Sequence, residues 1–385
     1  MKIMLVAGEP SGDLHGARLA KAILEQNPAV ELFGLGGPLM AEAGVRLIAD
    51  PTAVSLIGFV EVFQHVRYLL RLLKQAAHIL RLQRPDAVVF IDFPEFNMRL
   101  AKVAKGLGVP SLYYFSPSVW AWRRGRAKKL GKLVDMVAAV FPFEADIYRR
   151  AGAEVIYLGH PLLDTVQPSM DEVEIHRFLN IVPEAMKIAL MPGSRRQEIK
   201  AHLPTMLEAG RLIQEQVQRP VQYLVPVAAG IDDELIREVI AQRGEGLNLR
   251  LVHGYQYDVL AVADLVIVAC GTATLEAALL EVPMVTVYRL SKTTYRIAKL
   301  LVKVPHVALP NVIAGREIVP ELIQDEFTPE TVVRAAMPLL QGEAREEQRK
   351  ALAQVKVTLG PPGAVARCAA LVLKLAAERG VDPRG

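Results

Sequence analysis

The sequence predicts an α/β protein with two domains, each built on a parallel β-sheet that helices cover on both faces. Short apolar runs rich in Val, Ile and Leu alternate with helical patterns in the first half of the chain. The alternation stops in residues 159–182, a stretch with Pro and Asp, and then restarts. Strands that are apolar on both faces and separated by helices are typical of covered parallel sheets. A chain of 385 residues also exceeds the usual size of one compact core.

The apolar runs themselves are the expected strands. In the first half they span residues 3–7, 31–35, 87–91, 111–115, 136–140 and 154–158. In the second half they span residues 188–191, 221–225, 249–252, 265–268 and 284–287. We therefore expect a first domain at residues 1–165 and a second at 166–360. After the Gly/Pro break at 360–363, we expect the C-terminal helix of segment 361–385 to pack back on the first domain or on a partner subunit.

Composition limits the possible classes of protein. Hydrophobic residues make up 52% and charged residues 22%, which excludes a disordered chain. The mean hydropathy of +0.25 is high, yet no apolar run reaches the roughly 18–20 residues that cross a bilayer. The two cysteines, Cys270 and Cys368, have neither disulfide-framework nor zinc spacing. The start lacks a signal-peptide pattern, so we expect a cytoplasmic protein, and nothing predicts a nucleic-acid partner.

The turn after the first expected strand predicts ligand binding. It reads Gly8-Glu9-Pro10-Ser11-Gly12-Asp13 and leads into a helix. Small residues let a phosphate or sugar approach the main chain, and the helix that follows presents N–H groups and a positive dipole end. We expect Gly8, Glu9, Ser11 and Gly12 to contact substrate.

Asp92 is the candidate catalytic residue. It follows the expected strand 87–91 and precedes Phe93-Pro94-Glu95. Ligands of open parallel sheets bind just outside the carboxyl ends of strands, so a carboxylate at this point faces the ligand. Apolar surroundings would raise its pKa and suit it to act as a general base. The alternative is that Asp92 only caps the next helix.

Two further strand-to-helix turns occur in the second half. Arg195, in Pro192-Gly193-Ser194-Arg195, offers a charged clamp for a diphosphate beside the backbone donors of a Gly-Ser turn. In the turn at 271–276, Gly271, Thr272 and Thr274 are expected to hold phosphate, and Glu276 to accept hydrogen bonds from ribose. The alternative is a helix cap with a capping-box glutamate. Walker A, complete GxGxxG and Asp-x-Asp motifs are absent from the sequence, so we expect no metal ion in the chemistry.

Segment 55–83 has the residue pattern of a helix with a basic stripe along one face. The basic residues Arg67, Arg71, Lys74, His78 and Arg81 recur at three- and four-residue spacing, with leucines over much of the remaining circumference. A helix of this kind suits lipid head groups, although a core helix or a dimer-facing helix has the same pattern. The two tryptophans, Trp120 and Trp122, suit sugar stacking, membrane anchoring or a buried aromatic corner.

Six motifs together resemble the lipid A disaccharide synthase family, in the same order and over most of the chain. They are Gly8-Glu9-x-Ser11-Gly12-Asp13, Ile91-Asp92-x-Pro94-x-Phe96-Asn97, Ser116-Pro117-Ser118-Val119-Trp120-Ala121-Trp122, Pro192-Gly193-Ser194-Arg195, Gly271-Thr272-Ala273-Thr274-Leu275-Glu276 and Leu309-Pro310-Asn311. The sequence departs from the family pattern at Glu95, where aspartate is common, and at Cys270, where serine is common.

The resemblance implies an inverting, metal-independent GT-B glycosyltransferase with two Rossmann-like lobes that face each other across a cleft. It implies that UDP-2,3-diacylglucosamine donates its sugar to 2,3-diacylglucosamine 1-phosphate, which gives a β(1→6)-linked disaccharide 1-phosphate and UDP. It further implies Asp92 as the catalytic aspartate, Asn311 as a substrate-binding residue, and no cofactor. The first lobe would bind the acceptor and the membrane, and the second the UDP-sugar donor.

The acylated substrates favour a peripheral location on the inner face of the cytoplasmic membrane, and a homodimer is possible. Two alternatives remain at this stage. One is a UDP-sugar epimerase of the same architecture, which would act on a soluble substrate. The other is a peripheral membrane protein that senses nucleotides without catalysis.

Overall fold

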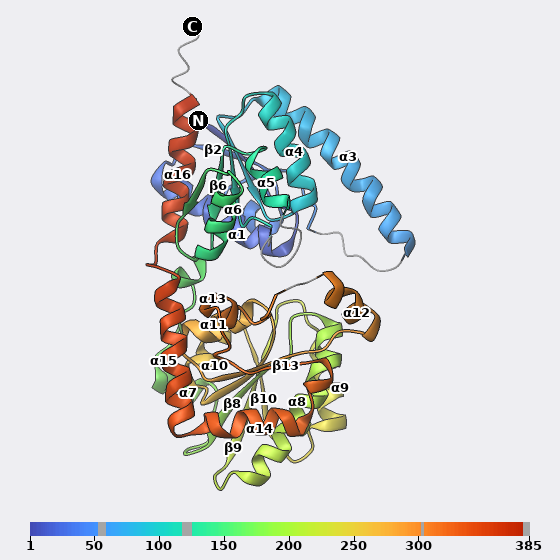
Figure 1. Cartoon of the computed structure of the whole chain (residues 1–385), viewed down its shortest axis with the longest axis vertical. Helices are drawn as coiled ribbons and strands as arrows, with labels where there is room; N and C mark the ends of the chain where they lie inside the picture. The colour runs from blue at the N-terminus through green and yellow to red at the C-terminus, as the bar shows by residue number, and fades with distance from the viewer. Residues whose placement is uncertain (53–58, 118–124, 302–303, 380–385) are drawn as a thin grey trace. The chain divides into compact units, whose positions relative to one another are not determined.

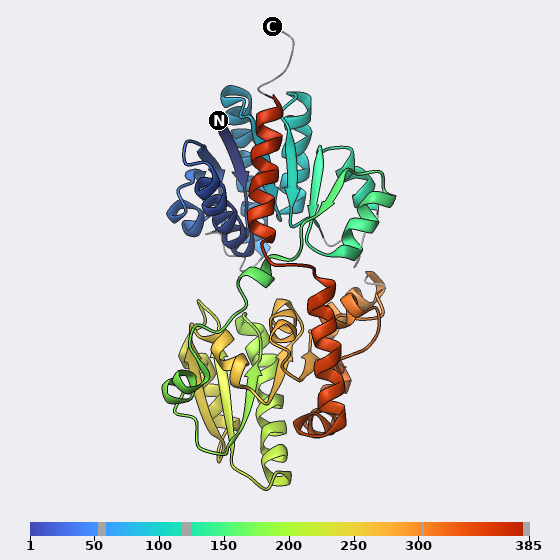
Figure 2. The ribbon, with the colours of Figure 1, turned by 90° about the vertical axis from the view of Figure 1, so that its left-hand side faces the viewer.

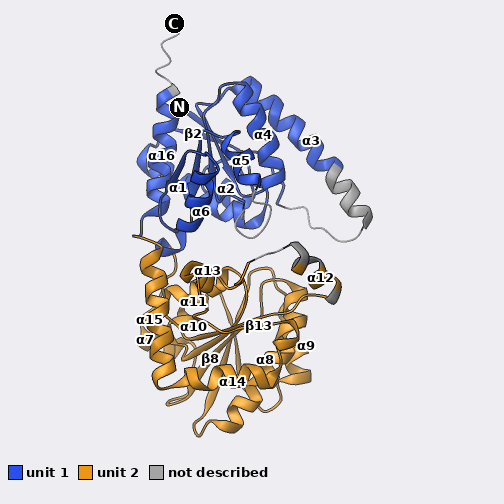
Figure 3. Cartoon of the chain, viewed as in Figure 1, with its two compact units in different colours: residues 1–164, 361–385 blue, residues 165–360 orange. Residues whose placement is uncertain are grey.

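The computed structural model describes residues 1–52, 59–117, 125–301 and 304–379, which form two compact units (Figure 1). Unit 1 comprises Met1–Asp164 and Pro361–Gly385, and unit 2 comprises Thr165–Gly360 (Figure 3). Each unit has its own parallel sheet with helices on both faces. The predicted α/β fold class with two parallel-sheet domains is therefore confirmed.

The described part of unit 1 contains a seven-stranded parallel sheet in the order β3-β2-β1-β4-β5-β6-β7. Its strands are β1 (Lys2–Val6), β2 (Glu31–Leu35), β3 (Arg46–Ala49), β4 (Ala87–Ile91), β5 (Ser111–Tyr114), β6 (Met136–Ala139) and β7 (Val155–Tyr157). Its helices are α1 (Pro10–Gln26), α2 (Pro38–Glu42), α3 (Phe59–Gln83), α4 (Pro94–Gly106), α5 (Gly125–Gly131), α6 (Pro142–Arg150), η1 (Pro161–Asp164) and α16 (Ala364–Arg379).

Successive residues of β1 pack into two different cores, because strand side chains alternate between the faces of a sheet. Ile3 and Leu5 join the core formed with α1 and α16. Met4 and Val6 join the core formed with α3 and α4. Both faces of the sheet are therefore buried, as the apolar run at 3–7 predicts.

Helix α16 returns to unit 1 from the far end of the chain and packs against α1 (Figure 2). Its buried residues Cys368 and Val372 belong to the same core as the α1 side of the sheet. The Asp164 carboxylate accepts hydrogen bonds from the backbone N–H groups of Gly363 and Val365, at the start of α16. Arg367 donates to the carbonyl oxygen of Leu158 at 2.7 and 3.0 Å. These contacts join η1, β7 and α16 into one unit.

The described part of unit 2 contains a six-stranded parallel sheet in the order β10-β9-β8-β11-β12-β13. Its strands are β8 (Met186–Met191), β9 (Val221–Val227), β10 (Asn248–His253), β11 (Leu265–Ala269), β12 (Met284–Tyr288) and β13 (Glu321–Ile323). Its helices are α7 (Glu172–Phe178), α8 (Arg196–Gln216), α9 (Asp233–Arg243), α10 (Gln256–Val262), α11 (Thr272–Leu279), α12 (Lys292–Leu301), α13 (Leu309–Ala314), η2 (Gln324–Glu326), α14 (Pro329–Leu340) and α15 (Glu343–Thr358).

Strand order places a topological switch point in the middle of each sheet. In unit 1, β1 lies between β2 and β4, so consecutive crossovers leave it in opposite directions. In unit 2, β8 has the same position between β9 and β11. Ligands of such sheets bind outside the carboxyl ends of the strands at this point. Apart from Asn311, which lies in α13, the candidate residues follow β1, β4, β8 and β11, in the turn or in the start of the next helix.

Candidate active site

The backbone of Asp92 is fixed directly after β4. Its N–H donates to the carbonyl oxygen of Tyr114 at 3.2 Å. Its own carbonyl oxygen accepts from the hydroxyl of Tyr113 at 2.6 Å and from Nδ2 of the buried Asn97 at 2.8 Å. Asp92 has a left-handed φ of +49°, a conformation that asparagine and aspartate tolerate better than most residues. Three neighbours thus hold the main chain where the strand ends.

The carboxylate of Asp92 accepts a hydrogen bond of 3.3 Å from the hydroxyl of Ser11. Burial raises the pKa of this carboxyl above its ordinary range, while hydrogen bonds from the Phe93 backbone and the Ser11 hydroxyl act in the opposite direction. The residue at the N-cap of α4 is Phe93, with no side-chain capping bond. The capping alternative for Asp92 is therefore wrong, and its side chain remains suited to proton transfer.

Gly8 lets the β1–α1 turn approach the β4–α4 turn closely, whereas Gly12 leaves room for an ordinary contact there. A Cβ on Gly8 would lie 2.3 Å from Cδ1 of Phe93, and a Cβ on Gly12 would lie 3.5 Å from the carbonyl oxygen of Ile91. Both glycines are buried, whereas Glu9 and Ser11 are exposed. Gly8 therefore allows the close packing that brings Ser11 to Asp92.

Asp13, the last residue of the same motif, has a structural role. It is 3% exposed and accepts hydrogen bonds from the backbone N–H groups of Gly37, Leu39 and Met40 at 2.8–3.1 Å. These donors belong to the first turn of α2, which has no other side-chain cap. Asp13 thus joins α1 to α2 below the site.

His15 lies one turn into α1 and stacks on Phe115, with ring centroids 3.6 Å apart. Burial, with smaller contributions from the charges of Arg18 and His160, lowers its pKa to about 3. Its Nδ1 is buried without a hydrogen-bond partner. The His15 imidazole is therefore neutral near pH 7. A neutral imidazole is unsuited to act as a general acid.

The second-half candidates meet at a cavity of about 370 Å³ in unit 2, at the carboxyl ends of β8 and β11. Arg195, Gly271, Thr272 and Glu276 all line it. The sequence interpretation missed other lining residues: Glu198 in α8, Pro226 in β9, Ala228 directly after β9 and Gln256 in α10. None of these belongs to a glycine-rich turn, so no local signal marked them. The volume falls within the ~300–1,000 Å³ of small-molecule sites.

Glu198 changes the interpretation of the Gly-Ser turn. Its carboxylate accepts hydrogen bonds from the backbone N–H groups of Ser194 and Arg195, at 3.0 and 3.2 Å. It also pairs with the guanidinium of Arg195 at 2.7 Å, although the Arg195 side chain remains 76% exposed. A Cβ on Gly193 would lie 2.5 Å from this carboxylate. The turn donors expected to receive phosphate are therefore occupied by Glu198.

In the turn after β11, the N-cap of α11 is Gly271, with no side-chain cap. The capping-box alternative is therefore wrong. Glu276 accepts a hydrogen bond of 3.1 Å from the hydroxyl of Tyr257. Thr272 is exposed in the cavity wall, but Thr274 is fully buried and donates to the carbonyl oxygen of Gly271 at 2.7 Å. Thr274 thus stabilises the turn. The ligand contact that the sequence analysis expects for Thr274 is wrong, because its side chain is buried and already bonded.

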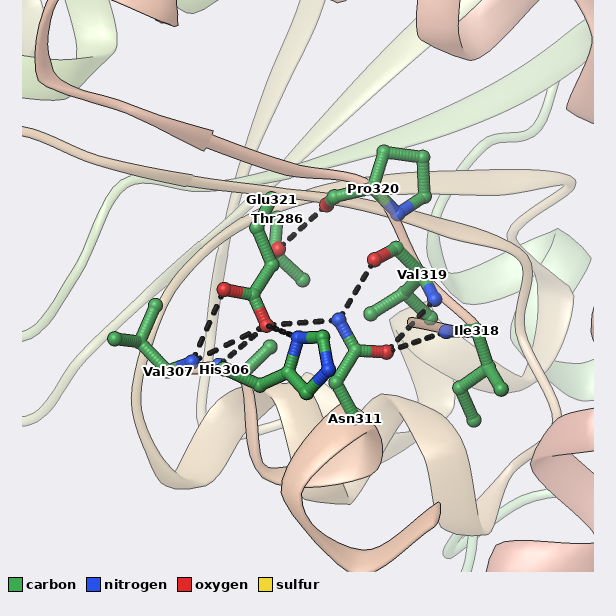
Figure 4. Close-up of polar contacts among 9 residues, drawn as sticks. Thr286, His306, Val307, Asn311, Ile318, Val319, Pro320 and Glu321 are labelled. Carbon is green, nitrogen blue, oxygen red and sulfur yellow. Dashed lines mark hydrogen bonds and ion pairs between the residues drawn. The ribbon is translucent and has the colours of Figure 1, made fainter. Parts of the chain in front are cut away.

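Asn311 is likewise a structural residue (Figure 4). Its Nδ2 donates to the carbonyl oxygen of Val319 at 2.8 Å and to a carboxylate oxygen of Glu321 at 2.7 Å. Its Oδ1 accepts from the N–H groups of Ile318 and Val319 at 2.7 and 2.9 Å. Both amide hydrogens and both acceptor positions are used, and the residue is fully buried. The direct substrate contact implied for Asn311 is therefore wrong.

Helix α3 belongs to the core and also has an exposed charged face. Leu72, Ala76 and Leu80 are buried against the sheet. The basic residues Arg67, Arg71, Lys74, His78 and Arg81 are all exposed. Leu70 and Leu82 are 43% and 68% exposed. Among the described residues, no helix has the length and apolarity required to span a bilayer. Trp120 and Trp122 lie outside the described residues, so sugar stacking, membrane anchoring and a buried aromatic corner stay open as predictions for them.

Comparison with known proteins gives a match over almost the whole chain. A family model described as Lipid-A-disaccharide synthetase matches residues 3–370. The lipid-A-disaccharide synthase of Syntrophus aciditrophicus is 40% identical over 374 residues, which is 97% of each chain.

Solved structures of lower identity share the fold. A putative UDP-N-acetylglucosamine 2-epimerase from Listeria monocytogenes has a TM-score of 0.67 at 14% identity, covering 98% of this chain and 97% of its own. A glycosyltransferase from Rickettsia africae has a TM-score of 0.59 at 13% identity, covering 99% and 98%. At these identities the likeness concerns the fold alone, which is of the GT-B type.

Proposed function

Because this chain belongs to the lipid-A-disaccharide synthetase family and is a glycosyltransferase that forms a disaccharide, we propose that Asp92 is its general base and that unit 2 binds the UDP-sugar donor. The observation that carries the assignment of the base is the raised pKa of a carboxyl held at the carboxyl end of β4. A carboxyl with a raised pKa is a stronger base than an ordinary carboxyl.

In the proposed reaction the donor is UDP-2,3-diacylglucosamine and the acceptor is 2,3-diacylglucosamine 1-phosphate. Asp92 takes the proton of the acceptor's primary hydroxyl, whose oxygen attacks the anomeric carbon of the donor. The bond from that carbon to the UDP oxygen breaks, and UDP leaves with the electron pair. One direct displacement inverts the configuration and gives the β(1→6) linkage.

We assign the stabilisation of the departing UDP to the cavity of about 370 Å³ in unit 2. The exposed Arg195 supplies positive charge for the diphosphate, and the N-terminus of α11 at Gly271 supplies backbone donors. The Ser194 and Arg195 amides become available to phosphate only when Glu198 moves away from them. Glu276 lines the same cavity and accepts a hydrogen bond from Tyr257, and we assign it the ribose hydroxyls of the donor.

We further propose that α3 places the protein on the cytoplasmic face of the inner membrane. The exposed basic stripe suits anionic head groups, and the exposed Leu70 and Leu82 suit the apolar region beneath them. Vesicle sedimentation tests this with Leu70→Ser and Leu82→Ser. Leu72 is left unchanged because it belongs to the core.

The decisive experiment measures UDP release from the full chain with each acylated sugar alone and with both together. Release that requires both sugars, with the disaccharide 1-phosphate detected by mass spectrometry, supports the proposal. The epimerase alternative is not favoured by the family, and an epimer formed from UDP-N-acetylglucosamine alone would revive it. Nucleotide binding without any product would support the sensor alternative.

A further inference from the structure

A second cavity in unit 2 adjoins the one assigned to the nucleotide. Its volume is about 650 Å³, and it shares Cys270, Gly271 and Thr272 with the 370 Å³ cavity. From these residues it extends past the carboxyl ends of β12 and β13 to the loop before α13. Its wall is mostly hydrocarbon: Tyr288, Leu290, Pro305, Val307, Leu309 and Ile323.

Two polar side chains of this wall, those of Glu321 and Gln324, are already engaged inside the unit, while the exposed Lys299 on α12 also lines the cavity. The Glu321 carboxylate accepts from the N–H groups of Val307 and Ala308 at 3.0 and 3.1 Å, and from Asn311 at 2.7 Å (Figure 4). The Gln324 side chain accepts from the N–H of Leu290 at 2.5 Å and donates to its carbonyl oxygen at 3.1 Å. Along the part of the wall formed by these two residues and the hydrocarbon side chains, a polar ligand would lose hydration with little return, whereas apolar surface gains from leaving water.

Tyr288 connects the two cavities. Its ring lines the second cavity, while its hydroxyl donates at 3.3 Å to Glu198, which lines the first. A ligand with its diphosphate at the Gly271 turn therefore has an apolar space beside it within the same unit. The volume of the second cavity also falls within the ~300–1,000 Å³ typical of ligand sites.

We propose that the second cavity holds an acyl chain of the UDP-sugar donor, and we call it the acyl cavity. The inference rests on the proposed function, which supplies an acylated donor. It assigns Asn311 an indirect part, because Asn311 holds Glu321 and the loop that forms the wall. The acyl cavity would thus allow unit 2 to distinguish an acylated donor from an unacylated UDP-sugar.

The test compares equilibrium binding of UDP-2,3-diacylglucosamine and of UDP to the full chain, by displacement of a fluorescent UDP analogue. The wild-type protein should bind the acylated donor at least about tenfold more tightly than UDP, because chain burial adds affinity. Val307→Trp adds bulk to a residue that lines the acyl cavity and should remove most of this difference while leaving UDP affinity unchanged. The matched control is Val357→Trp on α15, since both valines are exposed, at 41% and 69%.

A second variant, Leu309→Asp, puts a charge into the wall at the first position of α13, where an acidic residue suits the helix. It should also lower donor affinity and leave UDP affinity unchanged. Wild-type affinity for the donor in both variants would overturn the acyl cavity, as would an equal loss of UDP affinity. The proposed function fails separately, if wild-type protein releases no UDP with both acylated sugars present.

Discussion

The hydroxyl of Ser11 donates to the carboxylate of Asp92 across a distance of 3.3 Å, although 81 positions separate them in the chain. The two residues follow β1 and β4, which are hydrogen-bonded neighbours at the switch point of the sheet. Gly8 permits this approach because a Cβ there would lie 2.3 Å from the ring of Phe93, which follows Asp92. The proposed base and the hydroxyl that donates to it thus come from two turns that the fold brings together.

Asp92→Asn should lower turnover at least about 100-fold, because the amide cannot accept the proton. Asparagine is the chosen replacement since it tolerates the left-handed φ of +49°. Turnover is measured as UDP release, and UDP titration checks that the variant is folded. Glu95→Gln is the matched control, because Glu95 belongs to the same turn but pairs with Arg126. Near-normal turnover in Asp92→Asn would remove Asp92 from the base role.

The pH profile of kcat/KM should fall on the acid side as Asp92 takes up a proton, at a pH above the ordinary carboxyl range, because burial raises this pKa. The Ser11 hydroxyl favours the ionised form, so Ser11→Ala should raise the pKa further and move the acid limb to higher pH. Profiles of both proteins check the shift. A uniform loss at every pH, with the limb unmoved, would limit Ser11 to substrate contact.

Arg195→Ala should weaken UDP binding by roughly 10- to 100-fold, the range expected for a hydrogen bond to a charged group. Isothermal titration with UDP measures the change. Arg196→Ala is the control, because Arg196 is also exposed and lies next in the chain at the start of α8. Equal effects of the two substitutions would show that general positive charge, not the position of Arg195, attracts the diphosphate.

Asp164→Ala should lower the free energy of unfolding by about 1 kcal/mol, because it removes the carboxylate that accepts from the first N–H groups of α16. Thermal and urea unfolding measure the change. Asp146→Ala removes a carboxylate from the exposed pair with Arg149 and should have a smaller effect. A stability of Asp164→Ala equal to that of wild type would mean that α16 is held by its apolar face alone.

The central strands could be predicted from the sequence because they are buried on both faces. The run at 87–91 coincides with β4, all five residues of which are buried. The edge strands β3 and β13 were not predicted, since their residues are only partly buried and form no apolar run. Pairing with β2 and β12 makes them strands, and that is a tertiary effect.

Turn patterns predicted where the candidate site lies but not how its polar groups are used. Arg195, Gly271, Thr272 and Glu276 were predicted from local motifs and do line one cavity. The Asn311 side chain has no hydrogen-bonding capacity left for a substrate because main-chain groups seven and eight residues later use its oxygen. No sequence motif describes these partners. The occupation of the Ser194 and Arg195 amides depends on how the Glu198 side chain folds back, which residue spacing does not determine.

The return of α16 to unit 1 has a consequence for biosynthesis. A ribosome releases the N-terminal segment of unit 1 first, then all of unit 2, and the helix with Cys368 and Val372 last. Unit 2 has its full sequence in one stretch and is able to fold while the nascent chain is still growing. The apolar surface of α1 that α16 will cover stays exposed to solvent throughout that interval. We therefore expect chaperones to bind the nascent chain at this surface.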